Sequence, residues 1–344
     1  MSNKQTSRQE CGHVSFSHSD SSVDAIMFFS KSGTSERRRR MRALPKACTS
    51  LARPSFVSAN AVMTVDRKAS IRKVPHHKLF KSEPDPSWFG NPANPSGDKR
   101  GWSAPNWLTS RFHFSFAEYS SSKNDSFGVL RVMNDDLVMP KRGFGEHGHA
   151  NMEICTYVVE GALTHKDSMG TSETLTRGAI QFMTAGKGVR HSEHNLDSSK
   201  PLRFIQMWIT PNAGGLAPNY GSHSFSRDDM ANRWCAAVSP VPGAGKDGGT
   251  APVQINQDAS IKVTELAPGV ALPFATNAGR QAYMLCVEGA FAVNAGSETA
   301  ATLERHDAAE FSSGADVVLL AGAKGAHVLV VEMAERGRSG REDL

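Results

Sequence analysis

The chain of 344 residues has few cysteines and no long apolar segment. The five cysteines are odd in number and scattered, and none forms a Cys-x-x-Cys pair. This argues against a disulfide scaffold and for a reducing intracellular compartment. A transmembrane helix needs roughly 18 or more consecutive apolar residues. The longest early apolar run, residues 25–29, is far shorter, so we expect no membrane span.

Outside the N-terminal region, the chain has almost no excess of positive or negative charge. Residues 1–53 hold ten of the 39 Lys and Arg but only four of the 34 Asp and Glu, which leaves 29 basic against 30 acidic residues elsewhere. The net charge of +5 therefore belongs to the N-terminal region. A nearly neutral body offers no bulk charge to attract a phosphate backbone, so we expect no direct nucleic-acid binding by the folded part.

Residues 1–70 are rich in Ser, Arg and Lys and show no hydrophobic periodicity, which predicts a disordered basic tail. Between residues 37 and 65 there is no acidic residue but there are seven basic ones, a composition typical of a mitochondrial or plastid transit peptide. The run Arg37–Arg40 fits nuclear import equally well. Cytoplasm, nucleus and an organelle all stay open, as does cleavage of the first 60 residues. We expect residues 337–344 to be flexible.

From about residue 108 the chain reads as short β-strands separated by turn residues. β-Branched, aromatic and alternating residues recur in segments 112–116, 127–132, 154–159 and 202–209. Strands at such spacing, with Gly and Asp-Ser turns between them, indicate an all-β sandwich or barrel. One short helix is predicted at residues 227–233, with Ser226 as its N-cap.

Two pairs of polar residues stand out in this β-rich pattern. His147 and His149 are two residues apart, and so are His191 and Glu193. Side chains two apart on a strand project from the same face, so two such strands facing each other would aim three imidazoles and one carboxylate at one point. This mixed set suits Fe(II), Mn, Ni, Cu or Zn. A closed four-ligand site would suit structural Zn, an open one would suit chemistry, and the plain alternative is polar residues lining a barrel mouth.

A short internal sequence repeat predicts two copies of one barrel. Residues 157–162 (Tyr-Val-Val-Glu-Gly-Ala) recur 128 positions later as residues 285–290 (Leu-Cys-Val-Glu-Gly-Ala). We therefore expect two barrels in tandem, a metal-binding barrel over residues 71–212 and a second barrel over residues 213–336. A monomer is favoured, because closed double barrels need no partner to cover their edges.

The second copy has lost the candidate ligands. A shift of His147, His149 and Glu153 by 128 positions lands on Ala, Asn and Gln at positions 275, 277 and 281. His327 loosely echoes the loop of His191 but stands alone, so we interpret it as structural or exposed. A single active site is expected, in the first barrel.

Glu153 is the candidate proton acceptor. It stands four residues after His149, and this even spacing would point it inward on a strand. It would then orient a ligand's N–H or take a proton from a substrate hydroxyl, and the alternative is a salt-bridged strand residue. Among its neighbours in sequence, Cys155 is expected in the core, His165 in a structural role and His194 facing solvent.

Taken in order, several segments resemble the pirin family of bicupins. They cover about two-thirds of the chain and are densest between residues 114 and 211. The matching segments are Phe114–Tyr119, Phe127–Asp135, Met152–Ile154, His165–Gly170 and Met183–Glu193. The resemblance implies two cupin (jelly-roll) barrels. It also implies metal binding by His147, His149, His191 and Glu193, with iron as the metal of family members and other divalent ions able to replace it.

The resemblance also suggests functions. Several pirin family members show flavonol (quercetin) dioxygenase activity, and animal members act as nuclear, redox-responsive transcription cofactors. The leading hypothesis is therefore a quercetinase-type dioxygenase acting on a flavonol and O2, with Glu153 as base. A non-enzymic iron-dependent redox sensor with a protein partner is the alternative, and a cupin isomerase or hydrolase is a third possibility. The chain departs from the family pattern at Gly148 and Ala150, where Pro and Arg are common, which puts substrate preference in doubt.

Overall fold

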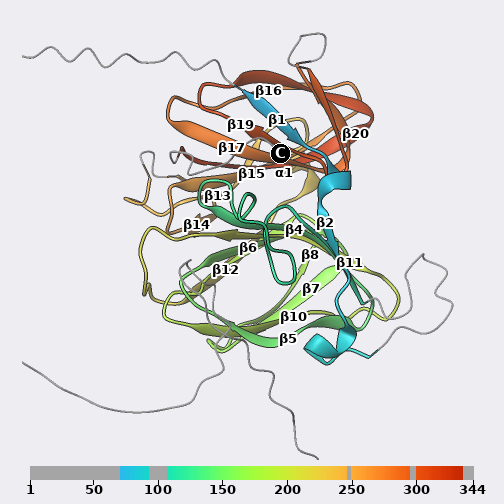
Figure 1. Ribbon diagram of the computed structural model, residues 1–344, viewed down its shortest axis with the longest axis vertical. Coiled ribbons are helices and arrows are strands. Elements are labelled where there is room, and N and C mark those ends of the chain that lie inside the picture. The colour runs from blue at the N-terminus through green and yellow to red at the C-terminus, as the bar shows by residue number, and fades with distance from the viewer. Residues whose placement is uncertain (1–69, 93–106, 246–248, 295–299, 336–344) are drawn as a thin grey trace, which may run out of the picture.

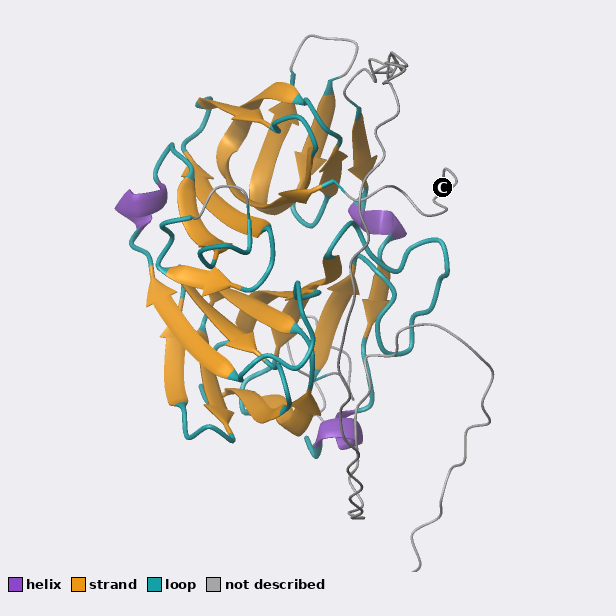
Figure 2. Ribbon diagram, turned by 90° about the vertical axis from the view of Figure 1, so that its left-hand side faces the viewer, coloured by secondary structure: helices purple, strands orange, loops and turns teal. Residues whose placement is uncertain are grey.

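The computed structural model describes residues 70–92, 107–245, 249–294 and 300–335. The predictions made for residues 1–69 and 337–344 lie outside the described residues. Within them the chain is almost entirely β-structure, as predicted, and forms two barrels stacked one on the other (Figures 1 and 2). No helix in the described part is long and apolar enough to cross a membrane.

The first barrel consists of a seven-stranded sheet and a four-stranded sheet. The larger sheet contains, in spatial order, β12 (Asn219–Ser224), β9 (Ala179–Thr184), β6 (Glu153–Glu160), β11 (Leu202–Ile209), β4 (Leu130–Val138), β3 (Leu108–Phe112) and β2 (Phe80–Ser82). The smaller sheet contains β5 (Arg142–His149), β10 (Val189–Asn195), β7 (Ala162–Asp167) and β8 (Ser172–Thr176). The candidate ligands lie on β5 and β10, neighbours in the smaller sheet.

The second barrel is built from one sheet of nine strands. They are β1 (Ile71–Val74), β13 (Cys235–Pro240), β14 (Val253–Ile255), β15 (Ala259–Leu266), β16 (Ala271–Ala275), β17 (Arg280–Val293), β18 (Ala301–Glu304), β19 (Ala308–Phe311) and β20 (Asp316–Ala334). The short helical turns are η1 (His76–Lys78), η2 (Pro86–Phe89) and α1 (Arg227–Met230).

The predicted boundary between the barrels does not separate the two sheets. β1 falls in the range predicted for the first barrel, yet it pairs with β19 of the second (Figure 1). β12 falls beyond residue 212, yet it pairs with β9 of the first barrel. Each barrel is thus completed by a strand from outside its own predicted range, because pairing depends on a free sheet edge and not on proximity in sequence.

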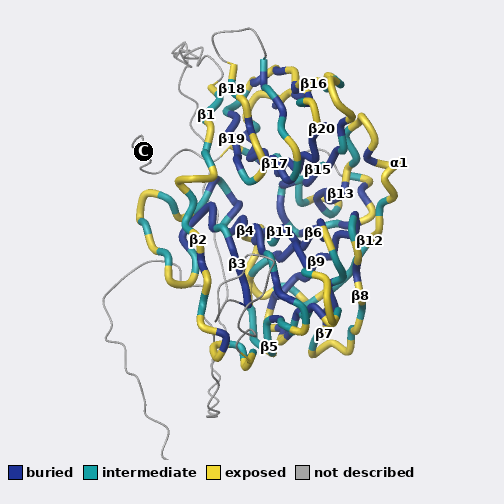
Figure 3. The backbone as a smooth tube through the Cα atoms, turned by 90° about the vertical axis from the view of Figure 1, so that its right-hand side faces the viewer, coloured by how far each residue is buried: buried dark blue, intermediate teal, exposed yellow. Residues whose placement is uncertain are grey.

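The barrels share one hydrophobic core, which lies between their sheets. It combines Cys155, Tyr157 and Val159 of β6 with apolar residues of the second barrel such as Ile261 and Leu329. The alternate residues of β6 point the other way, into the first barrel, where Val158 joins a separate cluster. Strands in the middle of the molecule are therefore buried on both faces (Figure 3). Cys155 is confirmed as a core residue, and burial raises the pKa of its thiol.

Polar side chains of the two barrels contact each other across the interface. Arg203 donates two hydrogen bonds to Asp135, at 2.8 and 2.7 Å, and Asp135 also bonds His306 of the second barrel. Elsewhere His327 bonds the Tyr157 hydroxyl at 3.0 Å and Glu288 at 3.1 Å. His327 is buried, so the structural interpretation of this histidine is confirmed.

The predicted helix is present but shorter than expected. Ser226 caps α1, and the hydroxyl of Ser226 accepts the backbone N–H of Asp229, as the sequence predicts. The helix ends at Met230 and not at residue 233, because Ala231 is extended and Asn232 takes a positive φ of 56°. The Asn232 side chain then accepts a hydrogen bond from the backbone of Ala267, which ties the chain to the second barrel.

Candidate metal centre

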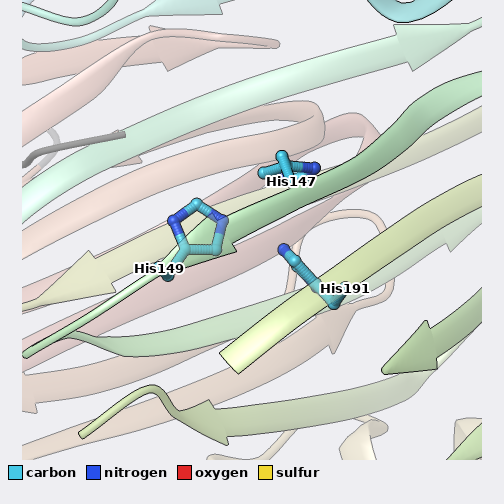
Figure 4. A group of neighbouring side chains, drawn as sticks. All are labelled: His147, His149 and His191. Carbon is cyan, nitrogen blue, oxygen red and sulfur yellow. The ribbon is translucent and has the colours of Figure 1, made fainter. Parts of the chain in front are cut away.

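The register of β5 and β10 brings three histidines together. The strands are antiparallel, with His191 opposite His147 and Val189 opposite His149. Because His147 and His149 project from the same face, all three rings meet, with centroids 4.6 to 4.9 Å apart (Figure 4). Their ring nitrogens lie within 4.8 Å of one another. Two strands, one with an i, i+2 pair, thus supply three nitrogen donors.

Glu193 lies on the inner side of this group. The register of β10 shifts between His191 and Glu193, so that Glu193 stands opposite Phe144. Its carboxylate forms a second close group with His191 and His165, again within 4.8 Å. The two groups share His191. The structure therefore gathers all four predicted ligands around His191, with the carboxylate on the buried side. An added Cβ at Gly143 would overlap the backbone of Glu193, so glycine permits this close approach of the two strands.

Burial favours the neutral form of His149 and His191, the form that binds a metal ion. Burial and the neighbouring imidazoles hold the pKa of His191 well below its usual range, and burial together with His147 lowers the pKa of His149 to about 3. The Nδ1 atom of His147 lies 2.7 Å from the carbonyl oxygen of Gly145 and must donate to it, so Nε2 is the nitrogen of His147 that is left to bind a metal ion. Neutral imidazoles with free lone pairs are what a metal ion requires.

His191 provides a test of whether a metal fits. It is 2% exposed, and neither of its ring nitrogens has a hydrogen-bond partner among the described residues. Leaving a buried polar atom unpaired costs roughly 1–3 kcal/mol. A divalent cation held by His147, His149, His191 and Glu193 would satisfy this ring and neutralise the buried carboxylate. The donor set is that of a transition metal and not of Ca²⁺ or Mg²⁺, which prefer oxygen ligands.

Glu153 is not part of the centre, and the inward orientation predicted for it is wrong. Its carboxylate accepts hydrogen bonds from Thr184 at 2.9 Å and from Asn256 of the second barrel at 3.1 Å. It shares a face of β6 with Cys155, toward the core between the barrels. Even spacing fails here because residues 150–152 form a turn between β5 and β6, and strand alternation does not continue through a turn. Glu153 is a buried tie between the barrels.

Two aromatic side chains that the sequence did not indicate, Trp208 and Phe89, pack against the histidines of the centre. Trp208 of β11 packs edge-on against His149 with centroids 4.8 Å apart, and Phe89 of η2 packs against His147 at 5.9 Å. Trp208 could have been found, since it alternates with Gln206 on a predicted strand. Phe89 could not, because it reaches the site from a turn about 60 residues away in sequence. Phe144 and Met183 belong to apolar clusters beside the centre.

His165 is buried and makes both a polar contact and an aromatic contact. Its Nε2 lies 3.0 Å from Asp167, its ring stacks on Tyr220 at 4.6 Å, and its Nδ1 has no partner among the described residues. His194, expected to face solvent, is partly buried, because its strand packs between β5 and β7.

These features define the class of protein: a double-barrelled cupin with a group of residues in its first barrel that fits a metal ion. Family comparisons agree. Residues 97–209 match the Pirin family model, and residues 244–333 match the model for the quercetinase C-terminal cupin domain.

Individual relatives make the assignment specific. A pirin-like protein of Caulobacter vibrioides is 37% identical over 197 residues, which is 57% of this chain and 82% of that protein. A quercetin 2,3-dioxygenase of Escherichia coli is 44% identical over 128 residues, which is 37% of this chain and 55% of that enzyme. The crystal structure of the bacterial pirin YhhW from E. coli in complex with nickel(II) superposes with a TM-score of 0.61 and 27% identity, covering 77% of this chain and 99% of that one. The chain belongs to the pirin family.

Proposed function

We propose that this protein is a metal-dependent dioxygenase that cleaves a flavonol-like aromatic substrate with O2. The observation that carries the proposal is the cluster of three imidazoles and one buried carboxylate, in which neither nitrogen of His191 has a partner among the described residues. Support comes from relatives named as quercetin 2,3-dioxygenases. Iron(II) is the proposed native ion, and Mn, Ni, Cu and Zn fit the same donor set.

The chain's own residues would hold the ion and shape its surroundings. His147, His149, His191 and Glu193 are the proposed ligands. When bound, a divalent ion supplies the Lewis acidity that lowers the pKa of a coordinated hydroxyl group. His147 and His149 are only partly buried, whereas His191 and Glu193 are fully buried, so access to the centre is from the side of β5. The edges of Trp208 and Phe89 next to these two histidines suit a flat aromatic ring.

The base proposed from the sequence is not available. Glu153 lies on the far face of β6 and cannot reach a substrate at the centre. Glu193 lies beside the histidines, but it is a proposed metal ligand, and its carboxylate already accepts hydrogen bonds from Gln181, Thr156 and Gln206. We therefore assign the proton of the flavonol 3-hydroxyl to solvent, since coordination to a divalent ion would lower the pKa of that hydroxyl group. Both oxygen atoms of O2 then enter the cleaved product, and one ring carbon leaves as CO.

The test is anaerobic reconstitution of the full chain with Fe(II), Mn(II), Ni(II) and Cu(II), followed by measurement of quercetin loss, O2 uptake and CO release. The His147→Ala and Glu193→Ala variants are expected to lose turnover. His223→Ala is the matched control, because His223 is an exposed histidine on β12. Tight metal binding without turnover for any ion would refute the dioxygenase proposal and favour the redox sensor.

A further inference from the structure

The carboxylate of Glu193 is held by three hydrogen bonds from inside the first barrel. Gln181 donates its amide N–H to Oε1 at 2.9 Å, and the Thr156 hydroxyl donates to the same oxygen at 3.3 Å. Gln206 donates its amide N–H to Oε2 at 2.8 Å. The three donors come from β9, β6 and β11, neighbours in the larger sheet, so the sheet facing the ligand strands fixes the ligand from behind.

The orientation of Gln206 is itself determined. The indole Nε1 of Trp208 lies 3.3 Å from Oε1 of Gln206. An indole N–H can only donate, so it must face the amide oxygen, and the amide nitrogen must then face Glu193. On the other side, the Tyr220 hydroxyl lies 3.1 Å from Oε1 of Gln181 and 2.8 Å from Oε2 of Glu173, so its single proton is shared between them. The amide N–H of Gln181 faces Oε1 of Glu193, so both glutamines donate to the carboxylate.

These three hydrogen bonds occupy most of the acceptor positions of the Glu193 carboxylate. An ionised carboxylate has two acceptor positions on each oxygen. Those of Oε1 are taken by Gln181 and Thr156, and one of those on Oε2 is taken by Gln206. A single position remains, on Oε2.

We propose that Gln181 and Gln206 are positioning residues that fix the orientation of the Glu193 carboxylate and leave one of its oxygens, Oε2, to bind the metal ion. We call this pair the glutamine clamp. A carboxylate that binds through one oxygen would give the ion one ligand atom, so His147, His149, His191 and Glu193 would supply four ligand atoms in all. This inference rests on the proposed metal centre but not on dioxygenase activity.

The clamp is tested with Ni(II) alone, by calorimetric titration of the full-length protein. Replacing outer residues that orient a metal ligand weakens binding by about 10–100-fold. We expect losses in this range for Gln181→Met and Gln206→Met, since methionine fills a similar volume but donates nothing. The matched control is Gln281→Met, because Gln281 is a buried glutamine of the second barrel. Its Ni(II) affinity should match that of the unchanged protein.

A spectroscopic measurement separates positioning from general packing. The electron paramagnetic resonance spectrum of saturating Cu(II) reports the ligand geometry, and it should change in both clamp variants but not in Gln281→Met. If a clamp variant does not fold, Thr156→Val is the substitute, because it removes the weakest donor with little change in shape. It should alter the Cu(II) spectrum and reduce Ni(II) affinity, by less than the glutamine variants.

The outcomes are distinct. Unchanged Ni(II) affinity and Cu(II) spectra in the variants that fold would overturn the clamp. Protein that binds Ni(II) as described but leaves quercetin intact would support the clamp and refute the proposed function.

Discussion

Replacing His191 with leucine should stabilise the metal-free protein while abolishing its response to metal. His191 is 2% exposed, and both of its ring nitrogens lack partners among the described residues. Leucine has a similar volume and no polar atoms, so the change removes an unpaired buried group whose cost is about 1–3 kcal/mol. We therefore expect the free energy of unfolding of metal-free His191→Leu to exceed that of the unchanged protein by about that amount.

With metal bound, the unchanged protein should become more stable than His191→Leu. A ligand that binds only the native state at 1,000 times its Kd stabilises it by about 4 kcal/mol. The unchanged protein should gain this with Ni(II), and His191→Leu should gain almost none. The assay is urea unfolding with chelator and with excess Ni(II), with His223→Leu as control because His223 is an exposed histidine. A metal-free His191→Leu protein less stable than the unchanged protein, together with an equal gain from Ni(II) in both, would refute the reasoning.

Two further predictions concern the interface between the barrels. Glu153→Gln should keep Ni(II) affinity. Burial raises the pKa of Glu153, so the stability it contributes is full below its unfolded pKa of about 4.3 and is lost as pH rises through the folded value. The variant should therefore lose less stability than the unchanged protein between pH 5 and pH 8 in urea unfolding, and equal losses would contradict this. Asp135→Ala should cost about 3–5 kcal/mol in the same assay at pH 7, because it leaves the buried Arg203 without its carboxylate. The exposed Glu146, paired with Arg190, is the control, and Glu146→Gln should stay within about 0.5 kcal/mol. A comparable cost for both changes would show that burial does not matter here.

The sequence predicted the parts of the centre that depend on one strand at a time. Spacing by two residues placed His147 beside His149, and alternation on β10 placed Glu193 near His191. The all-β architecture followed from the length of the apolar segments and the turns between them. These features are local, because strand alternation fixes them before any strand finds its partner.

Features that depend on how the strands pair and pack could not be predicted from the sequence. The orientation of Glu153 depended on the turn after His149, which no spacing argument crosses. Gln181 and Gln206 carry no motif, since a glutamine on a strand is ordinary until the opposite sheet supplies a carboxylate. The pairing of β1 and β12 depended on which sheet edges were free, a property of the assembled barrels.

The pairing of β1 with β19 has a consequence for the order in which the molecule assembles. Val74 pairs with Ala308, so a strand made early in synthesis must wait for one made more than 200 residues later. Contacts so far apart in sequence slow folding, because the intervening chain has to be ordered first. β12, in contrast, follows β9 by only a few dozen residues, so the first barrel can close its sheet while the second is still being synthesised. We therefore expect the first barrel, which contains the candidate metal centre, to form first. The pairing of β1 with β19 should then be the last step of folding.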